Sequence, residues 1–556
     1  MNRKDSIRRK AFCDQADHSG WTSTSFISGM QENFMRKAAL ASLVTAIALT
    51  TGAVSAADPT PEQIEAYAKK TVDDFKITGL AITVVKGDSI IFQHGYGVRD
   101  IRQPDIKVDE NTLFPFASIG KAFTTASLAM LVDEGKLNWD DPVRNYIPEF
   151  EMSDPYITAE FSVRDLVTHR SGLSLGAGDL LVFPDANPNI KDILAAVKYL
   201  PPATSFRSEY AYDNLMYIIA GEVLSRIDGR PWSKVIEERV FKPLKMKSCK
   251  ALPSQGAEAK NTITQHLRIP GSWEGEPIDP RYVMGDSTAP AGGISCSIAD
   301  LSKWAQFWLN DATAPSGKRL ISEAQVKELW TGVTPQPVNP MMADLGGTHF
   351  SLYGLGWGLH DFHGKLLVSH SGGLLGAVSY FGLLPEEDIG VFVTSNDFAF
   401  GVSGLALQIL NDAAAPNSDS DWIGRLFEYY SNYQETAQQD AGLGADPKKD
   451  IAVEPVRPLA DYTGTYVDRW YGPVSIETRN SGLFIDMSRS DSLDAPLIPV
   501  GPDKFVARWP DRKLNADAYV IFKIIEDKVV GMEMTPVSET TDFSFDFDDL
   551  DFVKQP

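Results

Sequence analysis

The stretch FASIGK, residues 116–121, opens a predicted helix and places a serine and a lysine on one face of it. Ser118 and Lys121 are three residues apart, so the lysine amine can reach the serine hydroxyl. A serine needs a nearby base to become a nucleophile. A lysine serves as that base only where burial or a cationic neighbour lowers its pKa. Backbone N–H groups at the helix start would also face a developing oxyanion. Alone, the pattern is a weak signal that occurs by chance in many proteins, and an exposed helix start explains it better.

Two further motifs follow FASIGK along the sequence, each at the start of a predicted helix or on a predicted strand. YDN, residues 212–214, precedes a second predicted helix, and HSGG, residues 370–373, lies at a predicted strand. A tyrosine beside a lysine can act as a phenolate-like base, and an asparagine can hydrogen-bond a substrate amide. A glycine-rich strand edge lets a substrate backbone approach and offers a second N–H to an oxyanion. The plain alternatives are a core aromatic for Tyr212, a helix N-cap for Asn214 and a turn residue for His370.

The three motifs together resemble those of the serine β-lactamase and penicillin-binding-protein family, on its class C and esterase-like side. The likeness covers about residues 60–412. Several flanking segments are also similar to that family, namely GYG at 95–97, DDP at 140–142, LVTHRSGL at 166–173, PAGG at 290–293 and YGLGW at 353–357.

The resemblance implies how the catalytic residues work. Ser118 is expected to attack an amide or ester carbonyl and form an acyl-enzyme that water then clears. Lys121 and Tyr212 are expected to form the base pair that removes the Ser118 proton, and Tyr212 to hand a proton to the leaving group. No metal or other cofactor is expected, and the sequence contains no P-loop, H-E-x-x-H or C-x-x-C pattern.

The same resemblance implies the substrate side of the site. Asn214 is expected to bind substrate. His370, Gly372 and Gly373 of the third motif are expected to bind substrate or to form part of the oxyanion hole. The N–H groups of Ser118 and Gly373 would form the oxyanion hole. Penicillin-recognising members carry Lys-Thr-Gly at this motif, and that lysine attracts the substrate carboxylate. Histidine is mostly neutral near pH 7, so we expect peptide or ester substrates and weak β-lactamase activity at most.

Several functions stay open. We favour a serine peptidase of the S12 type acting on small peptides, including D-amino-acid peptides or a linearised cyclic peptide such as microcystin. A carboxylesterase, or a penicillin-binding sensor with slow turnover, would need the same residues. A carrier of apolar ligands is a third class. A Ser-His-Asp triad through His169 is also conceivable, but no G-x-S-x-G pattern surrounds Ser118, Ser171 or Ser371. We therefore expect His169 to be structural.

Length, charge and the N-terminus limit the class of protein. The 556 residues exceed what one hydrophobic core supports, and the net charge of −22 argues against a nucleic-acid partner. The basic start at 35–37, the apolar run at 38–54 and the small residues at 54–56 have the pattern of a secretory signal. We expect residues 1–56 to be cleaved, the protein to be exported to the periplasm or medium, and no stable membrane insertion afterwards.

The two cysteines beyond that signal, Cys249 and Cys296, leave two alternatives. In an oxidising compartment they could form a disulfide, and otherwise they are two separate buried thiols. Whether the chain forms a homo-oligomer also stays open.

Strand and helix patterns predict an α+β fold for residues 57–412. β-rich runs at 80–85 and 89–96 flank a turn and predict a hairpin. Further strands are predicted at 366–369, 377–383 and 390–394, and helices at 118–134, 162–168, 213–226 and 299–309. Strands at both ends with helices between them indicate a mixed domain, an antiparallel sheet flanked by helices, whose terminal strands are neighbours.

The last part of the chain predicts a second, all-β domain. Residues 413–458 contain a predicted helix at 422–433 and a linker from 438. Residues 459–556 predict a small barrel or sandwich with strands at 462–467, 474–478, 483–487, 504–509, 519–525, 529–534 and 543–547. The motif YTGTY at 462–466 resembles a lipocalin-like module attached to some peptidases of this family. The resemblance implies a module that packs against the catalytic domain and can restrict substrate size, or an accessory domain without a ligand.

Overall fold

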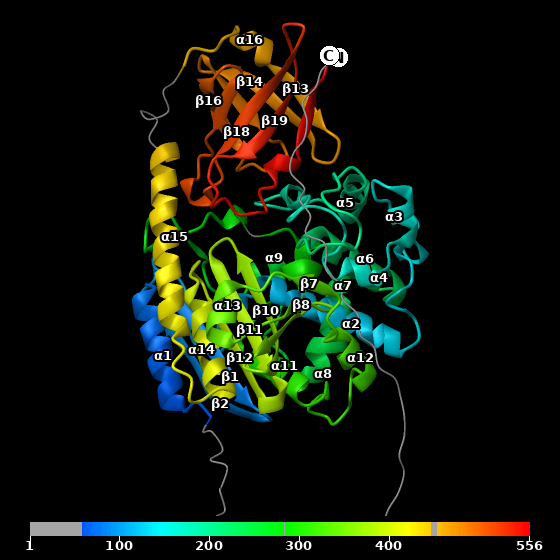
Figure 1. The fold of residues 1–556 in the computed structure, drawn as a ribbon, viewed down its shortest axis with the longest axis vertical. Coiled ribbons are helices and arrows are strands. Elements are labelled where there is room, and N and C mark those ends of the chain that lie inside the picture. The colour runs from blue at the N-terminus through cyan, green and yellow to red at the C-terminus, as the bar shows by residue number, and fades with distance from the viewer. Residues whose placement is uncertain (1–57, 283, 446–452) are drawn as a thin grey trace, which may run out of the picture. The chain divides into compact units, whose positions relative to one another are not determined.

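An antiparallel sheet joins strands from distant parts of the chain. The computed structural model describes residues 58–282, 284–445 and 453–556, so the proposed signal at 1–56 lies outside the described residues. Within these residues, eight strands form the sheet (Figure 1) in the order β2-β1-β12-β11-β10-β9-β8-β7. Their bounds are β1 Gly79–Lys86, β2 Ser89–Gly97, β7 Thr334–Gln336, β8 Ser351–Tyr353, β9 Gly358–Phe362, β10 Lys365–Leu374, β11 Ala377–Leu384 and β12 Ile389–Ser395.

The first and last strands of this sheet are neighbours, as the sequence predicted. β1 pairs antiparallel with β12, with Leu80 opposite Ser395. The predicted hairpin of β1 and β2 is also confirmed. Side chains alternate along β1, so Ile82 and Val84 enter one hydrophobic core and Ala81 enters another on the opposite face.

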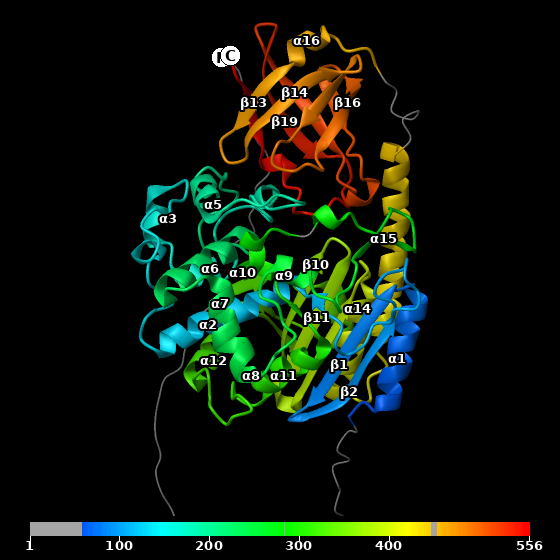
Figure 2. The same ribbon diagram turned by 180° about the vertical axis from the view of Figure 1, so that it is seen from behind.

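Helices cover both faces of the sheet (Figure 1, Figure 2). On one side lie α1 (Pro61–Asp74) and α14 (Gly401–Ala414), with α15 (Trp422–Ala445) packed beside them. On the other side, α2 (Lys121–Asp133) and α11 (Ile298–Leu309) contribute to the larger core. The mixed fold with a helix-flanked antiparallel sheet is therefore confirmed. No helix among the described residues is long and apolar enough to cross a membrane.

Shorter helices and two small sheets complete the sheet region, residues 58–445. The helices are α3 Pro155–Glu160, α4 Val163–Leu166, α5 Ile190–Val197, α6 Asn214–Asp228, α7 Trp232–Ile236, α8 Lys242–Leu244, α9 Pro253–Ala257, α10 Ala289–Gly292, α12 Glu323–Leu329 and α13 Pro340–Gly346. The two-stranded sheets pair β3 (Phe114–Pro115) with β6 (Ser295–Cys296), and β4 (His266–Arg268) with β5 (Gly275–Pro277).

α15 is longer than the sequence predicted. It continues from Trp422 through Ala445, so the first part of the predicted linker at 438–458 is helical. The added segment is rich in Ala and Gln, which favour a helix without any apolar stripe to signal it. Residues 446–452 of the predicted linker lie outside the described residues.

The C-terminal strands close into a barrel, which confirms the predicted all-β domain. A short helix, α16 (Leu459–Tyr462), precedes it. Among the described residues, the barrel strands are β13 Gly464–Asp468, β14 Gly472–Arg479, β15 Gly482–Asp486, β16 Asp494–Gly501, β17 Lys504–Ala507, β18 Ala518–Ile525, β19 Lys528–Pro536 and β20 Asp551–Lys554.

The strand predicted at 543–547 is wrong. This segment belongs to the long connection between β19 and β20, residues 537–550, which contains one 3₁₀ turn at Phe547–Asp549. The alternation of Phe545 and Phe547 imitates a half-buried strand. Both rings are buried, but Phe545 meets a phenylalanine of the sheet region and Phe547 meets a tryptophan of the barrel.

Candidate active site

Ser118 lies where a short turn becomes a helix. A one-turn 3₁₀ helix, η1 (Ala117–Gly120), continues directly into α2, which confirms the helix predicted here. Ala117 has a φ of 50°, in the left-handed region that residues with a side chain rarely adopt. Gly292 packs so closely that an added Cβ would lie 3.2 Å from the Ser118 nitrogen. Backbone strain of this kind persists only where the surroundings enforce it, and it clusters at functional sites.

Lys121 is fully buried beside the Ser118 hydroxyl. Its Nζ lies 3.1 Å from Ser118 Oγ, 2.7 Å from Asn214 Oδ1 and 2.9 Å from the carbonyl oxygen of Ala291. Burial lowers the pKa of Lys121 to about 7, because the charged amine loses its hydration. A large share of the amine is therefore neutral near pH 7, which is the form that can accept a proton.

Tyr212 lies next to the same amine. Lys121 Nζ is 4.6 Å from the centroid of the Tyr212 ring. Burial raises the pKa of Tyr212 well above 10, although a hydrogen bond with Ser118 opposes that rise. The phenol therefore keeps its proton near pH 7. The lowered pKa of Lys121 and the raised pKa of Tyr212 suit an amine that accepts a proton and a phenol that supplies one.

His169 packs under Tyr212 and is not joined to Ser118 by any hydrogen bond among the described residues. Its ring lies 4.2 Å from the Tyr212 ring, centroid to centroid, and its Nδ1 accepts a hydrogen bond from the backbone N–H of Asp213 at 3.1 Å. Burial lowers the pKa of His169 well below its usual value. A neutral, buried ring that supports Tyr212 fits the structural role expected from the sequence.

The third motif lies on β10 against the segment that precedes Ser118. A Cβ at Gly372 would lie 2.2 Å from the carbonyl oxygen of Phe116, so only glycine permits this approach. A Cβ at Gly373 would meet no other heavy atom within 4 Å. The geometry therefore leaves open space beside Gly373, where the sequence predicted an oxyanion donor.

His370 is buried, and both ring nitrogens are engaged inside the protein. Its Nδ1 donates to the carbonyl oxygen of Ser371 at 2.6 Å, so Nε2 is left to accept from the Tyr353 hydroxyl at 2.9 Å. Burial and the nearby charge of Lys121 lower the pKa of His370 to about 4. This position therefore provides neither a positive charge nor a free ring nitrogen to a substrate.

Two buried aspartates also lie in the site, and neither was predicted from the sequence. Asp179, in the short turn η3 (Asp179–Leu181), accepts a hydrogen bond from Asn214 Nδ2 at 2.9 Å. Asp213 is the N-cap of α6 and accepts from the backbone N–H of Met216. Burial raises the pKa of each carboxyl to about 7. Asp213 stood inside the YDN motif, whereas the segment around Asp179 has no recognisable pattern.

The barrel also reaches this site. The Phe543 ring lies 6.1 Å from the Tyr212 ring in an edge-to-face arrangement, and its side chain is 42% exposed. The neighbouring Ser544 donates its hydroxyl to Asp179 Oδ2 at 3.0 Å. These contacts come from the segment that the sequence analysis assigned to a strand.

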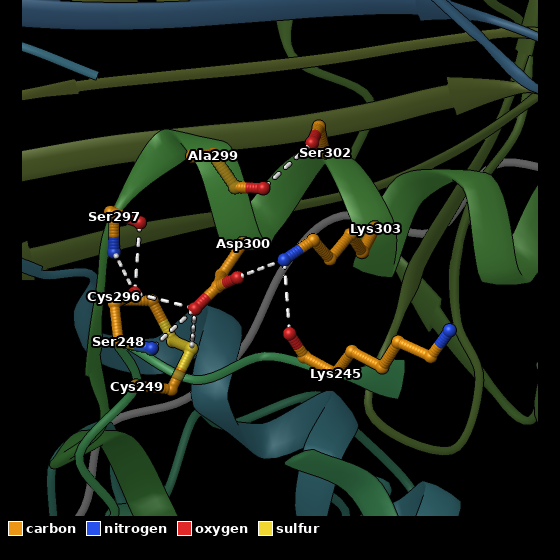
Figure 3. Close-up of a disulfide and its surroundings, with 9 residues drawn as sticks. All are labelled: Lys245, Ser248, Cys249, Cys296, Ser297, Ala299, Asp300, Ser302 and Lys303. Atoms are coloured by element: carbon orange, nitrogen blue, oxygen red, sulfur yellow. Dashed lines mark hydrogen bonds and ion pairs between the residues drawn. A yellow bond between two sulfur atoms is a disulfide. The ribbon is translucent and has the colours of Figure 1, made fainter. Parts of the chain in front are cut away.

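A disulfide joins Cys249 and Cys296, which decides between the two alternatives left by the sequence. Cys296 belongs to β6, and β6 pairs with β3, the strand that leads into η1. Figure 3 shows Asp300 beside the disulfide, where its carboxylate accepts from the N–H and the hydroxyl of Ser248, each at 2.6 Å. The disulfide therefore supports the strand pair that precedes Ser118. No cluster of potential metal ligands occurs among the residues that the structure describes.

Comparison with known proteins defines the family. Residues 64–414 match the family described as Beta-lactamase, and residues 448–554 match one described as Domain of unknown function (DUF3471). The protein belongs to the beta-lactamase family.

Curated relatives match the chain in sequence, and solved structures match it in fold. The chain is 27% identical to Unguisins hydrolase ungD' of Aspergillus campestris over 81% of this chain and 84% of that protein. It is 26% identical to Penicillin-binding protein 4 of Amycolatopsis lactamdurans over 53% and 75% of the two chains. The octameric penicillin-binding protein homologue from Pyrococcus abyssi shares the fold, with a TM-score of 0.57, 19% identity and coverage of 89% and 99%. A D-stereospecific amidohydrolase from Streptomyces sp. does so with a TM-score of 0.52, 20% identity and coverage of 65% and 100%.

Proposed function

We propose that this protein is a serine hydrolase that cleaves amide bonds of small peptides through an acyl-enzyme on Ser118. One observation carries the proposal. The buried amine of Lys121 lies 3.1 Å from Ser118 Oγ, and burial lowers the pKa of that amine to about 7. A serine hydroxyl with a neutral amine at hydrogen-bond distance is an activated nucleophile.

The proposed reaction has two halves. Lys121 takes the proton from Ser118 Oγ as the oxygen attacks the substrate carbonyl carbon, and the N–H groups of Ser118 and Gly373 stabilise the oxyanion. Tyr212 donates its proton to the leaving nitrogen as the amide bond breaks, and Lys121 returns a proton to Tyr212. A water then attacks the acyl-enzyme by the same proton path. Acid–base help contributes about 10²–10⁴ in rate, and each oxyanion donor about 10²–10³.

Peptides are the proposed substrate class, including D-amino-acid peptides or a linearised cyclic peptide. Two names support this proposal, because one relative is an unguisins hydrolase and one protein of the same fold is a D-stereospecific amidohydrolase. The buried, neutral His370 also supports it, since this position has no cation to attract a β-lactam carboxylate. Esters would react by the same steps, with β-lactams as poor substrates.

Export is part of the proposal. A disulfide persists in oxidising compartments, and Cys249 and Cys296 form one. N-terminal sequencing of the protein from its native cell is expected to begin near Ala57. A protein that keeps Met1 or Met35 in the cytoplasm would contradict export.

The test of the proposed function is a substrate panel on wild type, Ser118→Ala and a matched barrel variant, Ser475→Ala. The panel contains D- and L-amino-acid peptides, p-nitrophenyl esters and nitrocefin. Ser118→Ala is expected to lower turnover about 10⁴-fold or more, and to lose the mass gain that a fluorophosphonate gives the wild type. Wild-type turnover by Ser118→Ala on every peptide and ester would refute the proposal. Stable labelling without turnover would favour a sensor.

A further inference from the structure

The connection between β19 and β20, residues 537–550, is fastened to the sheet region beside the candidate active site. The sheet region and the barrel belong to one compact unit. The buried carboxylate of Asp546 accepts the backbone N–H of Gly178 at 2.6 Å and that of Leu180 at 3.0 Å. These two N–H groups flank Asp179, so Asp546 fixes the turn that holds it.

A chain of hydrogen bonds leads from this connection to the nucleophile. Ser544 Oγ donates to Asp179 Oδ2 at 3.0 Å, and Asn214 Nδ2 donates to the same oxygen at 2.9 Å. The other end of the amide, Asn214 Oδ1, accepts from Lys121 Nζ at 2.7 Å. Lys121 Nζ then lies 3.1 Å from Ser118 Oγ. Four hydrogen bonds therefore connect the barrel to the nucleophile.

This series of hydrogen bonds can form in one orientation only, because an asparagine amide has a donor end and an acceptor end. An ionised carboxylate only accepts, so Asp179 turns the Nδ2 end of Asn214 toward itself and leaves Oδ1 for Lys121. The second oxygen of Asp179, Oδ1, is buried without a hydrogen-bond partner among the described residues. Ser544 therefore provides much of the stabilisation that this carboxylate receives besides Asn214.

We propose that Ser544 is a positioning residue for the reaction: through Asp179 and Asn214 it orients the amine of Lys121 toward Ser118. The barrel is then a working part of the active site rather than a separate appendage. This inference rests on the proposed function, because it takes Lys121 to be the base.

The charges around Asp179 give the proposal a pH signature. The charged and titratable groups facing Asp179 and Lys121 come from several elements: Tyr212, Asp213, Tyr217, Asp546, His169 and His370. The Ser544 hydrogen bond lowers the pKa of Asp179, and the negative charge of Asp179 raises the pKa of Lys121. Loss of the Ser544 hydroxyl favours protonated Asp179 and so lowers the pKa of Lys121. The rising limb of the pH–rate profile should therefore move to lower pH.

The experiment compares Ser544→Ala with Ser492→Ala in the full chain. Ser492 is the matched control, because it is also a barrel serine and donates to Asp185 of the sheet region at 2.8 Å, away from the Lys121 hydrogen-bond chain. We expect Ser544→Ala to lower kcat about tenfold, as loss of a hydrogen bond to a charged group does, with little change in KM and with the rising limb moved to lower pH. Ser492→Ala should change neither kcat nor the position of the rising limb of the pH–rate profile.

Two further variants keep the outcome decisive. Ser544→Thr retains the hydroxyl and should restore most of kcat, and Asp179→Asn should move the limb in the same direction as Ser544→Ala. If Ser544→Ala fails to fold, Ser544→Gly, which also lacks the hydroxyl, decides the proposal by the same movement. If Ser544→Ala and Ser492→Ala had the same kcat and the same position of the rising limb of the pH–rate profile, the inference would be overturned. Turnover that survives Ser118→Ala would instead overturn the proposed function.

Discussion

The site has two walls that are built in different ways. The nucleophile wall, residues 116–121 with Tyr212, is part of the sheet region and is held by a helix start, a strand pair and a disulfide. The barrel wall, residues 543–546, is held by a few side-chain hydrogen bonds between residues about 365 apart in sequence. This difference predicts that the nucleophile wall performs the chemistry and that the barrel wall affects how precisely the reacting groups are placed. Substitutions in the nucleophile wall should abolish turnover, and substitutions in the barrel wall should lower turnover only in part.

The sharpest test of this comparison is Lys121→Arg. Arginine keeps its charge at every accessible pH, so it cannot accept the Ser118 proton. We expect kcat to fall about 10³-fold or more while the fold survives, measured by pre-steady-state acylation and circular dichroism. Lys198→Arg, on a partly exposed lysine paired with Glu151, is the control. If Lys121→Arg retained pH-dependent turnover, Tyr212 would be the base instead.

The pH dependence of the wild type is the next largest effect. Lys121 must be neutral to accept a proton, and burial lowers its pKa to about 7. kcat/KM should therefore rise with pH, about tenfold per pH unit on the acid side, and level off above neutrality. Asp179 and Asp213 titrate in the same range, so the apparent pKa belongs to the cluster. A profile that falls as pH rises through neutrality would contradict this assignment.

The same contrast between the walls explains what the sequence could predict. Ser118 and Lys121 are three residues apart, and local spacing is visible in a sequence. Asp179 and Ser544 meet across hundreds of residues, and no periodicity records such a contact. The contact between Asp179 and Ser544 could therefore be found only in the structure.

Errors in the barrel have equally physical causes. The segment at 543–547 imitates a strand because Phe543, Phe545 and Phe547 alternate with polar residues, yet it forms no ladder. β16 escaped prediction because it contains Pro496 and Pro499, which normally argue against a strand. The structure tolerates them beside an irregularity in the register between Pro499 and Gly501. β20 is only four residues long, too short to show a period.

Phe543→Ala tests the barrel wall for selectivity, with a smaller effect. Phe543 is half-exposed beside Tyr212, and Gly176 has no room for a Cβ against it. We expect kcat/KM to fall about three- to tenfold for peptides with a large apolar group next to the scissile bond, and little for small ones. The pH limb should stay in place, unlike that of Ser544→Ala. Phe350→Ala, on a phenylalanine that is 68% exposed, is the control. An equal loss of kcat/KM on every substrate would mean that Phe543 does not contact the substrate.

The smallest effect on turnover is expected from the disulfide, although it matters for stability. Replacing Cys249 and Cys296 by serine frees a loop of 47 residues and should lower the free energy of unfolding by about 2–4 kcal/mol. Turnover of the folded protein should change less than about twofold, because Gly292 still packs behind Ser118 and Lys121 keeps its acceptors. Thermal melts with and without dithiothreitol measure the first effect, and initial rates well below the melting temperature measure the second. A large loss of rate in a fully folded double variant would mean that the nucleophile wall depends on the disulfide as the barrel wall depends on its hydrogen bonds, and the contrast between the two walls would fail.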